Sequence, residues 1–411
     1  MFHFQLINIA VITAFASLCA ACGGAGGGGT DTVAMANTSG QVVNSYISGA
    51  TVTLDMNDDG ICDTSEPTTT TDASGRYSFA GKGEHLVCAT GGTNTVTGLP
   101  FVGRLLAPAR ATVVTPITTL IVKQVFSSLP APTTGKAAPL DPASVAAAQT
   151  KIMAQLSLPS ATPVLTTDPV ALMTKPGATS ADAKLEQTNA AVQVLLQLLA
   201  QSLVESANLP ITATANTTNE AFEASADGLQ TALTAVSGGP VDLTTATSAT
   251  TGRLINAMAM KAAATTKASK TLAAVSASFA SLSPTSFAAA MSSSPLPDLV
   301  NAVAASNLSS LTTKGGAEAV ALSANQIGTV MRQAASLITD SADSGSVAQL
   351  ALTNLMKTLL PTTGAAVTQA AANTAIADAI AKMNGAMPTG KPALTAPNIV
   401  AQPPVVIPKK G

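Results

Sequence analysis

The segment from Asp55 to Glu66 constrains the fold of this chain most strongly, because its acidic side chains repel one another in any compact loop. It contains five of the 22 acidic residues of the 411-residue chain. Asp55, Asn57 and Asp59 stand at positions 1, 3 and 5 of the pattern D-x-[DN]-x-[DN]-G-x5-E. Gly60 at position 6 permits a sharp turn, and Glu66 at position 12 supplies two more oxygens. Ca²⁺ takes six to eight hard oxygen ligands, so this spacing predicts a calcium site.

Two further residues complete the predicted ligand set. Position 7 offers the main-chain carbonyl of Ile61, and Asp63 at position 9 can bind directly or through water. The expected structural Ca²⁺ site therefore consists of Asp55, Asn57, Asp59, Ile61, Asp63 and Glu66. Extracellular modules hold calcium with dissociation constants of about 10⁻⁴–10⁻³ M, and we expect a similar affinity. The alternative is a solvated acidic turn that binds no metal.

Alternating sequences on both sides of this loop predict strands. Residues 51–55 and 76–79 alternate polar with apolar side chains, and residues 72–75 between them have turn composition. Residues 86–88 and 95–97 are weaker strand candidates. We expect a small β-sandwich over residues 31–107, so the loop would not belong to a helix–loop–helix EF-hand.

The order of these residues resembles a known group of modules. Residues 49–67 follow G-A-x-V-x-L-D-x-N-x-D-G and then D-x-x-E-P, and residues 71–79 follow T-D-x-x-G-x-Y-x-F. Both patterns are similar to the B-type repeats of Gram-positive serine–aspartate surface adhesins and to carboxypeptidase-regulatory-like and collagen-adhesin B-type sandwiches. The resemblance implies a calcium-rigidified stalk or spacer without catalysis. It covers only about a sixth of the chain, so it says little about the whole protein.

Cys62 and Cys88 predict a disulfide within the same module. Exported chains meet an oxidising environment, and an even pair of cysteines in a small β-module favours a bridge. A zinc site is disfavoured, because the module has no C-x-x-C and His85 is its only histidine.

The N-terminus predicts export. Residues 4–21 form a short apolar run without charge, typical of a secretory signal and too short for a confident membrane span. The small residues before Cys22 and the glycine after it resemble the lipobox of bacterial lipoproteins, although the first residues lack Lys and Arg and Cys19 stands where Leu is usual. The resemblance implies cleavage after residue 21, acylation of Cys22 and outer-membrane sorting, with residues 22–30 as a Gly-rich linker. The alternative is an ordinary signal peptide that leaves Cys22 as a free thiol.

Residues 108–385, rich in Ala, Thr and Ser, predict a helical domain. Thr115, Asp141 and Asp168 each precede a proline, an arrangement that caps a helix and begins it. The strongest pattern spans 180–208, where Gln193, Gln197 and Gln201 form one narrow polar stripe on an otherwise apolar helix, so we expect it to be buried in a bundle. The expected helices are 116–129, 142–156, 169–173, 180–208, 218–236, 243–282, 286–305, 317–341, 345–359 and 364–384. Residues 386–411 are Pro-rich and predicted to be extended or disordered.

Composition excludes several classes of function. With 20 Lys and Arg against 22 Asp and Glu, the chain lacks the positive charge that nucleic-acid binding requires. None of the common nucleophile, nucleotide-binding or zinc-protease motifs is present, and His85 would be the only histidine of the processed chain. We therefore expect no catalytic residues and no enzymatic activity.

The expected fold class is α+β and multidomain, with a small N-terminal β-sandwich followed by a larger all-α bundle. The expected function is that of an outer-membrane lipoprotein, facing the periplasm or the cell surface, with a structural or adhesive role. The expected partners are the membrane, through the lipid anchor, and an unidentified partner in the envelope or at the cell surface. The alternative is a carrier that holds an apolar small molecule or a lipid inside the helical domain.

Overall fold

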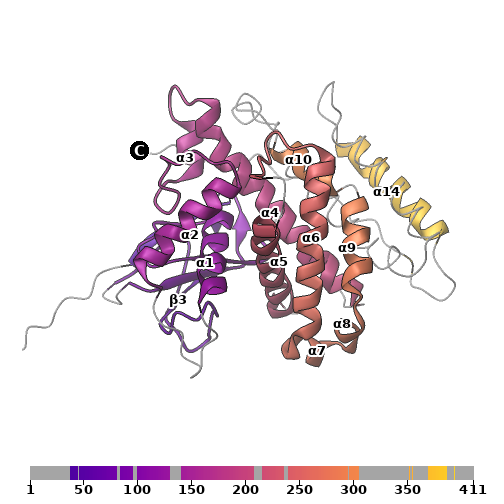
Figure 1. The fold of residues 1–411 in the computed structure, drawn as a ribbon, viewed down its shortest axis with the longest axis horizontal. Coiled ribbons are helices and arrows are strands. Elements are labelled where there is room, and N and C mark those ends of the chain that lie inside the picture. The colour runs from indigo at the N-terminus through magenta and orange to yellow at the C-terminus, as the bar shows by residue number, and fades with distance from the viewer. Residues whose placement is uncertain are drawn as a thin grey trace, which may run out of the picture. The chain divides into compact units, whose positions relative to one another are not determined.

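The computed structural model in Figure 1 describes twelve stretches of the chain. They are residues 38–44, 46–80, 84–95, 100–129, 140–207, 215–235, 239–294, 296–304, 351, 354, 369–386 and 393. The predicted signal peptide, Cys22, the Gly-rich linker and the predicted helix 317–341 lie outside these residues, as do most of 345–359 and of the Pro-rich tail.

Strands occupy the N-terminal part of the described chain and helices the rest, so the α+β class is confirmed. The strands predicted at 51–55, 76–79 and 86–88 are present, the last extended to Thr90. Of the predicted strand 95–97 only Thr95 is described, and it directly follows a two-residue strand at 93–94. The strands are β1 (Thr38–Val42), β2 (Ile47–Ser48), β3 (Thr51–Asp55), β4 (Thr68–Thr70), β5 (Arg76–Phe79), β6 (Leu86–Thr90), β7 (Thr93–Asn94), β8 (Arg104–Ala107) and β9 (Val113–Val114).

Two main sheets share one apolar layer. The order β4-β3-β6-β8 is antiparallel throughout, whereas in β5-β1-β9 the last pair is parallel. Strands β2 and β7 form a separate pair. Val42 and Phe79 from one sheet and Leu54 and Val87 from the other lie in the same buried cluster. Side chains from the two sheets therefore face a common interior, as in a sandwich.

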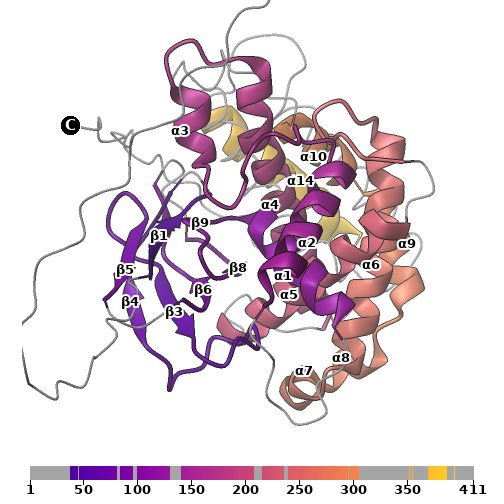
Figure 2. The same cartoon turned by 60° about the vertical axis from the view of Figure 1, so that its left-hand side comes forward.

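Strands β6 and β8 are buried on both faces, which explains their lack of polar alternation. One face of β6 contributes Val87 and Ala89 to the layer between the sheets. Its other face places Leu86 and Cys88 against Leu106 of β8 and Val122 of the first helix. A helix thus covers this sheet directly (Figure 2).

Eleven helices lie within the described residues, and most follow the expected bounds. Those that begin after Thr115, Asp141 and Asp168 start with the predicted proline, and each capping side chain accepts a hydrogen bond from a backbone N–H of the first turn. The helices are α1 (Pro116–Ser128), α2 (Pro142–Gln155), α3 (Pro169–Thr174), α4 (Ser180–Ser206), α5 (Ala215–Ala235), α6 (Ser248–Ala268), α7 (Lys270–Val275), α8 (Ala277–Ser281), α9 (Pro284–Ser293), α10 (Leu296–Ala304) and α14 (Gln369–Gly385).

The prediction of one long helix over 243–282 is wrong. Three helices, α6, α7 and α8, occupy this segment, with interruptions at Ser269 and Ser276. Each of these serines accepts a hydrogen bond at Oγ from a backbone N–H of the helix that follows, at 3.2 Å in both cases. Ser294 separates α9 from α10 in the same way within the expected helix 286–305. Serine competes with the helical backbone for these N–H groups, a local effect that apolar periodicity does not reveal.

Helix α4 is buried on nearly all sides, as its sequence predicts. It packs against α1, α3, α5, α6 and α10, and Figure 1 shows it beside α5. Gln193 and Gln201 of the polar stripe are 3% and 5% exposed. Among the described residues, no helix is both long enough and apolar enough to span a bilayer. The strands and helices from Ala36 onward form one compact unit, and their division into two domains at residue 107 stays a prediction.

The interior position of Gln193 gives a first prediction. Neither amide atom of its side chain has a hydrogen-bond partner among the described residues, and a buried polar group without a partner costs about 1–3 kcal/mol. Gln193→Met, which keeps the length of the side chain, should therefore raise the free energy of unfolding by about 1–2 kcal/mol. Urea denaturation of the full chain measures the change. The matched control is Gln197→Met, one turn further along and half-buried, which should give no gain. If Gln193→Met is no more stable than wild type, the premise that the wild-type Gln193 amide lacks hydrogen-bond partners is contradicted.

Candidate metal centre

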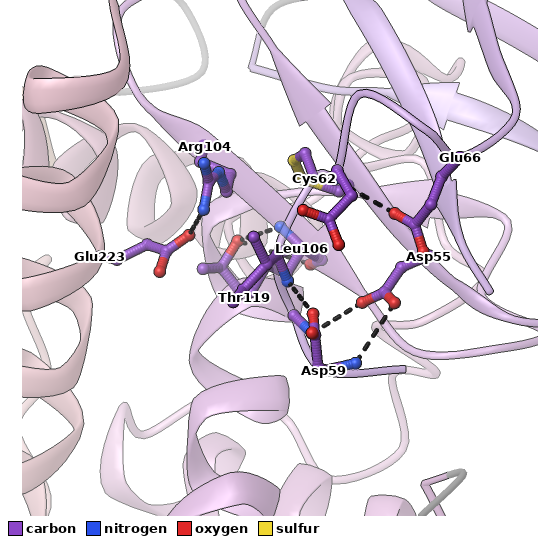
Figure 3. The surroundings of a disulfide bond; sticks show 12 residues. Asp55, Asp59, Cys62, Glu66, Arg104, Leu106, Thr119 and Glu223 are labelled. Carbon is purple, nitrogen blue, oxygen red and sulfur yellow. Dashed lines mark hydrogen bonds and ion pairs between the residues drawn. A yellow bond between two sulfur atoms is a disulfide. The ribbon is translucent and has the colours of Figure 1, made fainter. Parts of the chain in front are cut away.

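The predicted loop begins where β3 ends, and β3 fixes its first ligand. Asp55 is the last residue of β3 and is fully buried. Its Oδ1 accepts a hydrogen bond from the backbone N–H of Asp59 at 3.2 Å, and its Oδ2 accepts one from that of Gly60 at 2.6 Å. The chain therefore wraps around the Asp55 carboxylate, as the dashed lines in Figure 3 show.

The next two predicted ligands are ordered by short-range hydrogen bonds. The backbone N–H of Asp59 also donates to Oδ1 of Asn57 at 3.1 Å, and the Asn57 amide donates to Oδ2 of Asp59 at 3.0 Å. The other oxygen of Asp59 accepts from the N–H of Ile61 at 2.7 Å. The side chains at positions 1, 3 and 5 thus follow one another around a single tight turn.

Glu66 closes the loop. Its Oε1 accepts from the backbone N–H of Met56 at 2.8 Å, and its Oε2 accepts from that of Asp63 at 3.2 Å. The position-12 carboxylate thus spans the loop from position 2 to position 9. Figure 3 shows Asp55, Asp59 and Glu66 close to one another beside Cys62.

Two residues with positive φ shape the turn, at 56° for Asp58 and 81° for Gly60. Asp tolerates this conformation better than most residues, and glycine adopts it freely. The Asp58 carboxylate accepts from the backbone N–H of Leu86 at 2.8 Å and lies 3.3 Å from Nδ1 of His85. Asp58 was not among the predicted ligands, and the structure shows that it ties the loop to β6.

Gly60 is required for a second reason that the sequence pattern does not contain. A Cβ atom at this position would lie 2.7 Å from Cε2 of Phe126, near the end of α1. Since real Cβ contacts are longer, only glycine lets the ring approach the loop backbone this closely. Phe126 packs against the same apolar cluster as Cys62.

The disulfide between Cys62 and Cys88 is confirmed, with the two Cα atoms 5.8 Å apart. It joins the loop to the middle of β6, and Cys88 is fully buried. With Asp58 bound to Leu86, the loop has two attachments to β6, one covalent and one by hydrogen bond. Its acidic residues are therefore held close together.

Burial and like charge act against ionisation of Asp55. Burial is the main cause that raises the pKa of this carboxyl, with smaller contributions from the neighbouring Glu66 and Asp59. The hydrogen bond from Gly60 opposes the rise, and the net pKa is about 6. A divalent cation among these carboxylates would remove the repulsion.

The donor chemistry fits Ca²⁺, because Asp55, Asn57, Asp59 and Glu66 all carry side-chain oxygen atoms on one short loop. Each carboxylate oxygen that accepts an N–H bond keeps a second lone pair for a metal. The described residues nevertheless contain no group of three or more His, Cys, Asp or Glu side chains already arranged to hold a metal ion. Binding would therefore require small movements of these side chains.

Comparison with known proteins supplies no relative. No family model matches the chain, and neither a curated protein nor a solved structure matches it.

The raised pKa of Asp55 gives a second prediction, for the metal-free protein. The folded state holds this proton up to about pH 6, whereas the unfolded chain releases it near the ordinary value of 3.8. The contribution of Asp55 to stability should therefore fall as the pH rises from about 4 to about 6, by roughly 3 kcal/mol at most. Urea midpoints of wild type and Asp55→Asn, compared across this range, isolate the effect because Asn does not titrate. A difference between the two proteins that does not change with pH would contradict the assignment.

Proposed function

We propose that this chain is a cell-envelope lipoprotein in which a calcium-stabilised β-module carries a helical region with a structural or adhesive role. The observation that most supports the calcium part is the loop from Asp55 to Glu66. It combines the residues of the full calcium-loop pattern with a buried carboxylate that its neighbours repel. A cation would convert that repulsion into attraction.

The role of the metal would be structural. The loop is tied at Cys62 and Asp58, so binding has little room to cause a large movement. A Kd of about 10⁻⁴–10⁻³ M would keep such a site filled where calcium is millimolar, as outside cells. In that setting the β-module would act as a rigid support near the anchor.

The anchor would be the acylated Cys22. Each buried methylene contributes about 0.8 kcal/mol to membrane binding, so two or three acyl chains hold a protein firmly. The Gly-rich residues 23–29 would act as a flexible spacer. The disulfide supports a location outside the reducing cytoplasm. Together with the lipobox resemblance, these features favour the outer membrane.

The calcium site gives a third prediction. For a Kd of 1 mM, 10 mM calcium should stabilise the folded protein by about 1.4 kcal/mol, seen as a rise in Tm. Asp55→Asn combined with Glu66→Gln should abolish the rise. The control Glu84→Gln, which removes a carboxylate from the same module outside the loop, should keep it. Equilibrium dialysis that finds no bound calcium at millimolar concentration would contradict the proposal.

The lipid anchor gives a fourth prediction. Full-length protein produced in a bacterium that processes lipoproteins should sediment with membranes, and its N-terminal peptide should carry the mass of acyl chains on Cys22. Cys22→Ser should leave the protein unacylated. Gly26→Ser is the control, since Gly26 follows Cys22 outside the lipobox and its replacement should leave acylation unchanged. A mature N-terminus with an unmodified Cys22 would exclude the anchor.

A further inference from the structure

We propose that the metal loop and the ionic cluster between α1 and α5 are thermodynamically coupled through Phe126, so that a cation in the loop strengthens the attachment of α5 to α1. This inference rests on the proposed calcium site and adds a consequence for the helical region. It also assigns Phe126, which lies outside the ligand pattern, as a residue that positions the loop.

The first link joins the loop to α1. The ring of Phe126 lies directly against the backbone of Gly60, at position 6 of the loop. Phe126 and Cys62 both pack on a small apolar cluster that contains Leu106 and Val122. Any change in the loop that moves Gly60 or Cys62 therefore changes the surface on which the last turn of α1 rests.

The second link fixes the start of α1 to the sheet. The Thr118 hydroxyl donates to the carbonyl of Leu106 at 2.7 Å, and the Thr119 hydroxyl accepts from the N–H of Leu106 at 2.9 Å. All three residues are buried. The first turns of α1 are thus held on β8, and the turn that carries Phe126 is the part of the helix that contacts the loop.

The third link is the ionic cluster itself. Lys123 precedes Phe126 by three residues and is therefore its neighbour on the helix surface. Its Nζ lies 3.5 Å from Oε2 of Glu223 and 3.4 Å from Oδ1 of Asp227. Glu223 also pairs with Arg104 of β8, as Figure 3 shows. One residue further along α1, the amide of Gln124 accepts a hydrogen bond from Gln230 of α5 at 2.8 Å.

The cations of this cluster are largely shielded from water, because the side chains of Lys123 and Arg104 are each only 10% exposed. Burial acts to lower the pKa of Lys123, but attraction to Glu223 and Asp227 outweighs it and raises the pKa, so the ammonium stays charged. The loss of the partner of a buried charge strongly destabilises the folded protein. The position of α1 is therefore energetically linked to α5.

Coupling follows from these three links. Without a cation, repulsion among the loop carboxylates weakens the packing of Gly60 on Phe126 and loosens the last turn of α1. Lys123 and Gln124 then hold α5 less well. Coupling between binding sites is reciprocal, so weakening the Phe126 contact must also weaken calcium binding.

Hydrogen exchange on the full chain tests the inference. Calcium binding is measured in parallel by equilibrium dialysis. In wild type, calcium at ten times its Kd should slow the exchange of α5 amides by up to about tenfold. In Phe126→Ala, the loop should still bind calcium, several-fold more weakly, and exchange in α5 should no longer respond to it. If Phe126→Ala does not fold, Phe126→Leu is the second variant, because leucine keeps most of the apolar contact. In this variant calcium should slow the exchange of α5 amides less than in wild type.

Val125→Ala is the matched control. Val125 lies next to Phe126 on α1 but is buried in the large interior cluster and away from the loop. Its truncation should destabilise α1 while the calcium response of α5 remains. If the wild type binds calcium and hydrogen exchange in α5 does not change, the coupling is wrong but the calcium site stands. The same conclusion follows if calcium slows exchange in α5 of Phe126→Ala as much as in wild type. A wild type that binds no calcium would overturn the calcium site and the coupling together.

Discussion

The approach of the Phe126 ring to the backbone of Gly60 is the contact on which the arrangement of this protein depends. It places an acidic loop from the β-module directly against the helix that begins the helical region. Because α1 also packs on β8 and on α5, the loop, the sheet and the bundle share one element. The chemistry of a few carboxylates can therefore affect the packing of helices far away in the sequence.

Several polar groups at the junction between strands and helices are paired with one another. The backbone of Leu106 bonds to two threonines of α1, and Arg104 and Lys123 share Glu223. These bonds lie among fully buried apolar side chains, where an unpaired polar group is costly. They fix the orientation of α1, whereas apolar burial supplies most of the driving force for packing.

The sequence was sufficient for most features that depend on neighbours along the chain. Hydroxyl or carboxylate caps before proline located the starts of α1, α2 and α3, and alternation located β3 and β5. Two cysteines in one small module were enough to predict the disulfide. The loop spacing placed Asp55, Asn57 and Asp59 on one tight turn, as the pattern predicts.

The sequence was insufficient wherever structure depends on residues distant along the chain. Strand β9 consists of two valines that pair in parallel with β1, and so short a segment has no periodicity to detect. The roles of Asp58 and Phe126 come from contacts with Leu86 and Gly60 that no local pattern encodes. One local feature was missed as well: the interruptions at Ser269 and Ser276 depend on a balance between capping and helix continuation that Ala-rich periodicity hides.

The most direct test of this account is an anomalous-scattering map from crystals of the processed protein grown in millimolar calcium. We predict one strong peak in the loop, about 2.3–2.6 Å from oxygens of Asp55, Asp59 and Glu66 and from the Ile61 carbonyl. A well-ordered loop without such a peak, in crystals that contain excess calcium, would contradict the central claim.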